Sequence, residues 1–240
     1  MRTDASSARG LKQQIYLDLK DKLINCIYPP GTELNELMLT EEYKVSRTPV
    51  REAISQLELE GYVRVLPKRG ICISEVSVED VLQIFQTRCE IEPVTLKLAY
   101  PFLKVPDLLR LRSAFEKEET DLMKAFRLDM EMHIYLVDQC GNVYLKDMMH
   151  RLFSDTTRVV IATGQTRIKI HNARQEHIQI LDALIEGAAP DRCADLLRSH
   201  VQTCRAAALR YFSSKEYQDH LKETGIRIRD NRKGQSSAPR

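Results

Sequence analysis

The stretch VSRTPVREAI, residues 45–54, decides the fold of the first part of the chain. A side-chain oxygen of Ser46 or Thr48 can accept a backbone N–H at the start of a helix. Pro49 fits the first helical turn, where no amide donor is needed. Apolar residues then recur at helical spacing from Val50 until Gly61 interrupts them. We therefore expect a helix that begins in this stretch and ends before Gly61.

Two helices are expected before this one, and two strands after it. Residues 11–27 place apolar side chains four apart on one helical face, and Pro29-Pro30-Gly31 ends that helix. A short helix over 34–43 and a turn over 44–46 follow. Residues 62–65 and 71–74 alternate as the two strands of a hairpin. This order predicts a winged helix-turn-helix domain over residues 11–76, preceded by a flexible N-terminus over residues 1–10.

Arg47 and Arg51 are the main candidates for reading DNA. They lie four apart, so both project from one face of the third helix. The first residues of a recognition helix enter the major groove, where arginine can donate two hydrogen bonds to guanine. Ser46 and Thr48 lie beside them and are expected to contact DNA as well. The alternative is that the arginines only solvate a surface, with Arg51 paired to a nearby glutamate.

The tip of the hairpin supplies a second group of candidate DNA contacts. Lys68 and Arg69, followed by Gly70, are expected to track the DNA backbone or the minor groove. Acidic and basic side chains are equally numerous over residues 1–75. This balance does not exclude DNA binding, because the domain needs only one positive face.

These motifs resemble the signature of the GntR family of bacterial transcription regulators. The resemblance covers about residues 11–75 and rests on YPPGTEL (28–34), VSRTPVREAI (45–54), LELEGYV (57–63) and PKRG (67–70). It implies that Arg47 and Arg51 contact bases and that Arg69 and Gly70 lie in or over the minor groove. The chain departs from the family pattern at two positions. Cys26 stands where glycine is usual, and Leu37 stands where many members have an arginine that contacts DNA.

Residues 77–212 predict an all-helical domain, so the expected fold class is mainly α. Its helices are expected near 78–100, 106–124, 126–140, 143–162, 168–186 and 191–212. Apolar content falls after residue 212, and residues 213–240 are expected to form a basic, flexible tail. The basic residues of this tail either add nonspecific DNA affinity or remain solvated.

Four side chains of the metal-ligand type lie on apolar faces of these helices. Asp129 and His133 are four apart on one helix, and His177 and His200 lie in apolar stripes of two others. An unpaired buried polar group costs about 1–3 kcal/mol, so one shared divalent ion would satisfy all four at once. The alternative is that each histidine is satisfied separately in the core, with Asp129 bonded to one of them.

The helical segment also resembles the FCD effector-binding domain. The motifs are Arg88-x-x-x-Glu92, Asp129-x-x-x-His133, Glu176-His177 and Arg198-x-His200. The resemblance implies that Asp129, His133, His177 and His200 coordinate one metal ion in each subunit. Zn²⁺, Ni²⁺, Fe²⁺ and Mn²⁺ all suit this ligand set, and the sequence does not choose among them.

A small organic acid is the expected effector, bound beside the metal. Arg88 is the candidate for pairing its carboxylate, and the alternative for Arg88 is an ion pair with Glu92. Asn142 either lines the same pocket or caps the helix that follows it.

The composition fits a soluble protein of the cytoplasm. The chain has 240 residues, of which 43% are hydrophobic and 29% charged, with a net charge of +2. No apolar run is long enough for a transmembrane helix, and residues 1–10 lack a secretory signal. The six cysteines form no CxxC pair, which favours reduced thiols.

We therefore expect a homodimeric transcription regulator, a repressor, that binds a palindromic operator and responds to a metabolite. Two other functions are open at this point. A metal-dependent enzyme fused to a DNA-binding domain is disfavoured because no general base stands beside the ligands. A constitutive DNA-binding dimer would need neither metal nor effector.

Overall fold

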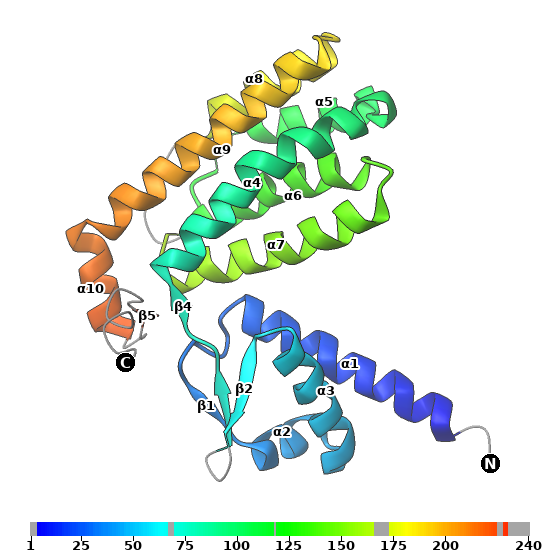
Figure 1. Cartoon of the computed structure of the whole chain (residues 1–240), viewed down its shortest axis with the longest axis vertical. Helices are drawn as coiled ribbons and strands as arrows, with labels where there is room; N and C mark the ends of the chain where they lie inside the picture. The colour runs from blue at the N-terminus through cyan, green and yellow to red at the C-terminus, as the bar shows by residue number, and fades with distance from the viewer. Residues whose placement is uncertain (1–3, 67–69, 118, 166–172, 225–227, 230–240) are drawn as a thin grey trace, which may run out of the picture. The chain divides into compact units, whose positions relative to one another are not determined.

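The structure, a computed structural model, describes residues 4–66, 70–117, 119–165, 173–224 and 228–229 (Figure 1). The chain divides into two compact units. The first holds the residues up to Ser77 together with those from Thr224 onward, and the second spans Val78–Glu223.

The first unit is a winged helix-turn-helix, as predicted. Its elements in order are α1 (Asp4–Ile24), β1 (Glu33–Leu34), α2 (Glu36–Tyr43), α3 (Arg47–Leu59), β2 (Val63–Leu66) and β3 (Gly70–Ile73). A core of fully buried side chains holds them together, including Leu23, Leu39, Val50, Leu57 and Ile73. The sheet has the antiparallel order β1-β3-β2, so a third strand that the sequence did not suggest lies beside the hairpin.

The recognition helix α3 starts and stops close to the expected residues. Ser46 is its N-cap residue, but the Ser46 side chain makes no capping hydrogen bond. Thr48, the other candidate for the cap, lies inside the helix. Gly61 follows the helix with φ +84°, a left-handed conformation that suits glycine. Gly31 also has a positive φ, whereas Lys44 ends α2 in the left-handed conformation without being glycine.

Cys26 and Gly70 also have positive φ angles. Cys26, which stands where the family usually has glycine, has φ +53°. A non-glycine residue in this region costs about 1–2 kcal/mol. Gly70 has φ +93°, and a Cβ there would lie 3.1 Å from the backbone oxygen of Leu34. Glycine at position 70 therefore lets β1 approach the hairpin.

Parts of the two segments that were expected to be flexible lie in regular secondary structure. Helix α1 already begins at Asp4, inside the N-terminal segment. Within the tail, α10 (Lys215–Thr224) forms a helix, and β5 (Ile228–Arg229) pairs in parallel with β4 (Val76–Ser77). The reason for α10 is local packing: Tyr217 is buried against Tyr211, and His220 donates to the Ala162 carbonyl at 3.0 Å. Of the basic tail residues, Arg227, Arg232 and Lys233 lie outside the described residues.

The second unit is all-helical over the residues that the structure describes. After β4 come α4 (Val78–Ala99), the 3-10 turn η1 (Tyr100–Phe102), α5 (Val105–Glu116), α6 (Leu122–Asp138), α7 (Val143–Ala162), α8 (Arg174–Ile185) and α9 (Pro190–Phe212). Helix α6 begins four residues earlier than expected, because the Asp121 side chain caps it by accepting from the Met123 and Lys124 amides. Among the described helices, none is both long and apolar enough to cross a membrane.

The core of the second unit combines apolar packing with a buried polar group. Helix α4 lies along α9, and α8 packs against α5 (Figure 1). Leu96, Leu111, Met132, Leu181 and Leu197 are almost fully buried between these helices. Among the buried polar side chains are Arg88, Glu92, His133, His177 and His200. Each of these buried polar side chains needs a partner inside the unit.

Candidate functional sites

The two candidate base-reading arginines are exposed on α3. The side chains of Arg47 and Arg51 are 66% and 64% exposed. Both approach one carboxylate on α2: Arg51 Nε donates to Glu36 Oε2 at 2.8 Å, and Arg47 Nε lies 3.8 Å from Glu36 Oε1. The expected glutamate partner of Arg51 therefore exists, yet most of each arginine remains available to a ligand.

The other predicted DNA contacts are only partly described. Ser46 and Thr48 are exposed beside the arginines, and Gly70 is exposed at the start of β3. Lys68 and Arg69 lie outside the described residues. Leu37, at the position where many family members have arginine, is 51% exposed on α2. Helix α2 therefore offers no cation at that position.

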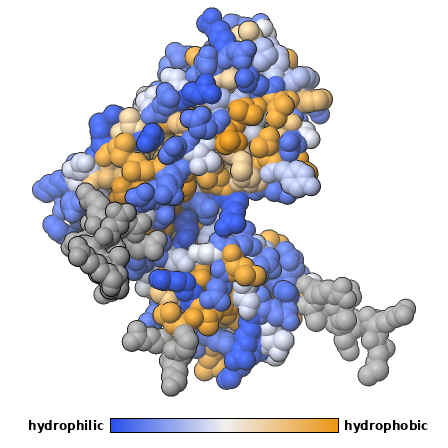
Figure 2. Space-filling view, viewed as in Figure 1, coloured by the Kyte–Doolittle hydropathy of each residue, from blue (hydrophilic) through white to orange (hydrophobic). Residues whose placement is uncertain are grey.

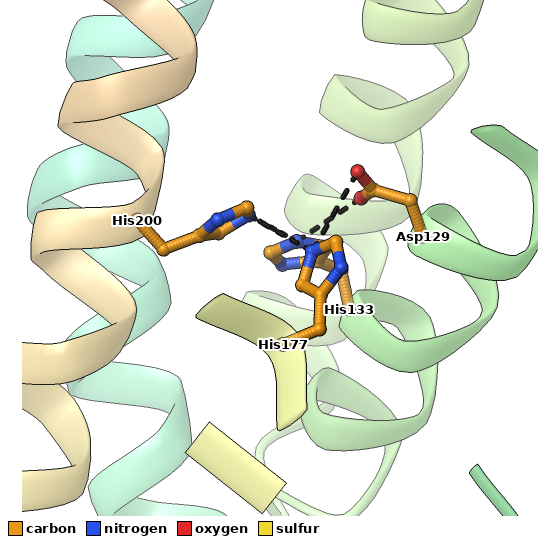
Figure 3. A group of neighbouring side chains, drawn as sticks. All are labelled: Asp129, His133, His177 and His200. Atoms are coloured by element: carbon orange, nitrogen blue, oxygen red, sulfur yellow. Dashed lines mark hydrogen bonds and ion pairs between the residues drawn. The ribbon is translucent and has the colours of Figure 1, made fainter. Parts of the chain in front are cut away.

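Asp129, His133, His177 and His200 come together in the helical unit, as Figure 3 shows. Asp129 and His133 project from α6, His177 from α8 and His200 from α9. Each offers one ligand atom, and these atoms all lie within 4.8 Å of one another. The sequence thus predicted correctly which residues meet, although they are spread over three helices.

The three histidine rings present the same nitrogen to the centre of the group. The Nε2 atom of His200 lies 3.3 Å from Nε2 of His133 and 3.1 Å from Nε2 of His177. Asp129 completes the group, with oxygens 3.2 Å from His133 Nε2 and 3.6 Å from His177 Nε2. Three imidazole nitrogens and one carboxylate group therefore converge.

Carboxylates stand behind two of the three rings. Glu92 Oε2 on α4 lies 2.5 Å from Nδ1 of His133, and Glu176 Oε2 on α8 lies 2.9 Å from Nδ1 of His200. Among the described residues, none makes a hydrogen bond to the buried Nδ1 atom of His177, and the His177 ring packs against Phe115. Two ligand rings are thus held by hydrogen bonds, and the third by packing.

The electrostatics of the group follow from burial and close opposite charges. Burial raises the pKa of Asp129 and Glu92, but the neighbouring cations and histidines outweigh it and lower the pKa of both, that of Glu92 to about 2. Burial lowers the pKa of His133, yet Glu92 and Asp129 raise it to about 9. For His177 burial prevails and lowers the pKa to about 3. The carboxylates are therefore ionised at neutral pH.

The four residues fit a divalent metal ion. With bonds of about 2.1 Å, the ligand atoms of a tetrahedral site lie ~3.4 Å apart. Contacts of 3.1, 3.2, 3.3 and 3.6 Å join the Nε2 atoms of the histidines to one another and to the two oxygens of Asp129, and the four ligand atoms all lie within 4.8 Å of one another. The hydrogen-bonded carboxylates behind His133 and His200 are the support that ligating histidines usually have. The donor set suits Zn²⁺, Ni²⁺, Fe²⁺ or Mn²⁺ alike.

Arg88 and Asn142, the two candidate effector ligands, differ in position. The Arg88 side chain is buried and pairs with Glu92 on the same helix. Its guanidinium carbon lies 5.5 Å from the ring centroids of both Phe85 and Phe153. Asn142 is exposed, and its side chain caps α7 by accepting from the Tyr144 and Leu145 amides. Of the two roles considered for Asn142, the structure favours the cap.

Sequence reasoning missed the roles of Glu92 and Glu176 as partners of the ligand rings. Both residues occur in the motifs that resemble the FCD domain, but spacing along one helix does not reveal a contact with another. Glu92 carried a usable signal: it occupies the same stripe as the buried residues Cys89 and Leu96, where a carboxylate needs a partner.

Comparisons with known proteins address the two segments separately. The family model described as "FCD domain" matches residues 83–203, and the one described as "Bacterial regulatory proteins, gntR family" matches residues 11–73. The HTH-type transcriptional repressor GlaR of Escherichia coli is 28% identical over 200 residues, which cover 78% of this chain and 91% of GlaR. The uncharacterized regulator YdhC of Bacillus subtilis is 28% identical over 177 residues, or 70% of this chain and 78% of YdhC.

A solved structure supports the fold. The structure of E. coli McbR/YncC has a TM-score of 0.69 at 23% identity and covers 84% of this chain and 98% of that one. Both segments that carry the sequence motifs thus have matches in known regulators.

Proposed function

Because the chain belongs to the GntR family of transcriptional regulators and carries an FCD domain, we propose that it is a cytoplasmic repressor controlled by a metal and a carboxylate. The family is one of DNA-binding regulators and not of enzymes. The observation that carries the metal-dependent part is the convergence of Asp129, His133, His177 and His200 in the core of the helical unit. GlaR is named a transcriptional repressor, which supports repression over activation in this proposal.

In this proposal, α3 reads the operator. On DNA, Arg47 and Arg51 leave the Glu36 carboxylate and donate to guanine bases instead. The edge of each guanine in the major groove offers two acceptors to a guanidinium. Ser46 and Thr48 lie at the same end of α3, where backbone contacts set the register. Lys68, Arg69 and Gly70 complete the contacts from the wing. Two such units would bind a palindromic operator, since protein and DNA then share one two-fold axis.

The effector is a small organic acid. Glu92 accepts from Nε of Arg88, so the proposal assigns the carboxylate of the effector to the two terminal guanidinium nitrogens. The metal, when bound, supplies a Lewis-acidic centre for the same carboxylate. Asp129, His133, His177 and His200 would hold that ion, and Glu92 and Glu176 would fix two of the rings.

The regulator acts as a homodimer in this proposal, and the helical unit offers a candidate surface. Figure 2 shows hydrophobic residues gathered on the visible face of this unit, along α4. Val94 and Leu98 lie one turn apart on α4, and Val105 and Leu109 one turn apart on α5, each between 42% and 48% exposed. We expect Leu98→Glu to shift the protein toward monomer in light scattering, whereas Leu59→Glu, at an exposed position of the first unit, leaves the dimer intact.

The test of the function combines metal analysis, thermal shift and operator binding. Protein purified without chelator is expected to contain one divalent ion per chain by elemental analysis. A screen of carboxylic acids should raise the melting temperature for some of them, and a chelator should abolish that shift. Those same acids should release an operator fragment selected from genomic DNA. Selective DNA binding with neither metal nor effector response would instead make the protein a constitutive DNA-binding dimer.

A further inference from the structure

Glu92 uses its two oxygens for two different neighbours. Oε1 accepts from Nε of Arg88, one turn earlier on α4, and Oε2 lies 2.5 Å from Nδ1 of His133 on α6. The side chains of Arg88, Glu92 and His133 are all at most 5% exposed. Bulk solvent therefore has little access to the carboxylate.

The chemistry of the two neighbours requires an acceptor on both sides. The Nε of arginine carries a hydrogen and can only donate. A histidine that coordinates through Nε2 keeps its proton on Nδ1, so His133 also donates to Glu92 when it serves as a ligand. An ionised carboxylate can accept from both, whereas an amide has one accepting oxygen and one donating nitrogen.

From this geometry we propose that Glu92 is a positioning residue that couples Arg88, the candidate effector ligand, to the metal ligand His133. The inference rests on the proposed metal site but not on the identity of the effector. The pairing of Arg88 influences which ring nitrogen of His133 carries the proton and how the ring is oriented. By linkage, any ligand that changes the pairing of Arg88 changes the affinity for the metal, and the metal changes the affinity for that ligand equally.

A second substitution should rescue the loss of the Glu92 carboxylate. In Glu92→Gln, the introduced amide can satisfy either Arg88 or the ligating form of His133, but not both. The additional substitution Arg88→Gln offers the amide at position 92 an acceptor, so its oxygen is free to accept from His133. The double variant also removes both members of a buried ion pair, which proteins tolerate far better than the loss of one member.

The experiment measures the Kd of Zn²⁺ alone by competition with a chromophoric chelator, on the full chain. We expect Glu92→Gln to raise this Kd by about 10–100-fold. The double variant Glu92→Gln/Arg88→Gln should return to within about 2-fold of the wild-type Kd. Circular dichroism melts confirm that each variant is folded, and the absorption spectrum of the Co²⁺-loaded protein reports the ligand set independently of affinity.

Glu176→Gln provides the matched control. Glu176 contacts His200 as Glu92 contacts His133, but its side chain is 29% exposed, so solvent can satisfy the introduced amide. Its effect should be smaller and should not be reversed by Arg88→Gln. An unchanged Kd in Glu92→Gln, or a double variant weaker than Glu92→Gln, would overturn the coupling. Wild-type protein that fails to bind Zn²⁺, Ni²⁺, Fe²⁺ or Mn²⁺ would overturn the proposed metal site itself.

Discussion

Arg47 and Arg51 expose about two thirds of their side chains, whereas His133, His177 and His200 expose 2% or less of each residue. The arginines share one carboxylate of α2 and have solvent around them. The histidines have Asp129, Glu92 and Glu176 around them, within an apolar core. Both groups of residues are candidates for ligand binding, yet only the second is also part of the core that holds its unit together.

This difference determines what a substitution does in each unit. An exposed arginine can be removed at little cost in stability, because water solvates what remains. A buried histidine or glutamate cannot be removed without leaving a polar partner unsatisfied, which costs about 1–3 kcal/mol. Binding and folding are therefore separable in the first unit and coupled in the second.

Metal removal should have the largest effect, and only in the second unit. A metal ion whose free concentration is about 1,000 times its Kd stabilises the folded state by about 4 kcal/mol. Hydrogen exchange read by mass spectrometry should show faster exchange in α6, α8 and α9 when a chelator is added. Exchange in α1–α3 should not change, and equal acceleration in both units would contradict the proposed location of the metal.

Two ligand substitutions should then separate metal binding from stability. His133→Ala and His177→Ala are both expected to abolish tight Zn²⁺ binding in chelator competition. In metal-free protein, His133→Ala should cost about 2 kcal/mol more than His177→Ala, since it deprives buried Glu92 of a partner. Urea unfolding followed by circular dichroism measures this difference. Equal costs would mean that the Glu92 contact contributes nothing to the fold.

Arg51→Ala should affect DNA binding without affecting stability. Loss of a bidentate contact to guanine costs about 1–3 kcal/mol of discrimination against other bases. Fluorescence anisotropy with operator and scrambled duplexes at one fixed salt concentration measures it. Arg110→Ala is the control, because Arg110 is 57% exposed and paired with Glu131, but lies in the helical unit. A mutant that still prefers the operator as strongly as the wild type would refute the role of Arg51.

The smallest expected effect concerns the contacts of the partly buried Glu60 in the first unit. Glu60 accepts from Tyr16 at 2.6 Å and from Lys20 at 2.7 Å. Burial raises the pKa of Glu60, but Lys20 and Tyr16 outweigh it and lower that pKa. The ionised form thus stabilises the fold above the unfolded pKa, and this contribution is lost as the pH falls through the folded pKa. We expect Glu60→Gln to cost about 1 kcal/mol at pH 7. In urea titrations, the difference from wild type should vanish in acid, and a difference that persisted below the folded pKa would rule out this ionic contribution.

The sequence predicted local features of the first unit well and distant pairings poorly. Pro49 and Gly61 mark the limits of α3 by backbone chemistry alone, so its place could be inferred. Strand β1 has only two residues, Glu33 and Leu34, and exists because they pair with β3 almost forty residues later. A strand this short has no pattern of its own, which is why it was missed.

In the helical unit, polarity on apolar faces was the useful signal. Asp129, His133, His177 and His200 could be grouped because each breaks an apolar stripe. The burial of Arg88 could not be inferred, because an arginine four residues before a glutamate is also a common exposed pair. The sequence also did not predict helix α10, because its residues are mostly polar. Among the residues of α10 whose side chains are described, only Tyr217 and His220 are buried.

The pairing of β5 with β4 has a consequence for how the chain is made. Val76 belongs to the first unit, but its partner Ile228 follows the whole second unit in the sequence. A ribosome releases α1–α3 early, and these helices can pack while the rest is still being synthesised. The hydrogen bonds between β4 and β5 must wait until α4–α10 have left the exit tunnel. The first domain to be translated is therefore the last to be finished.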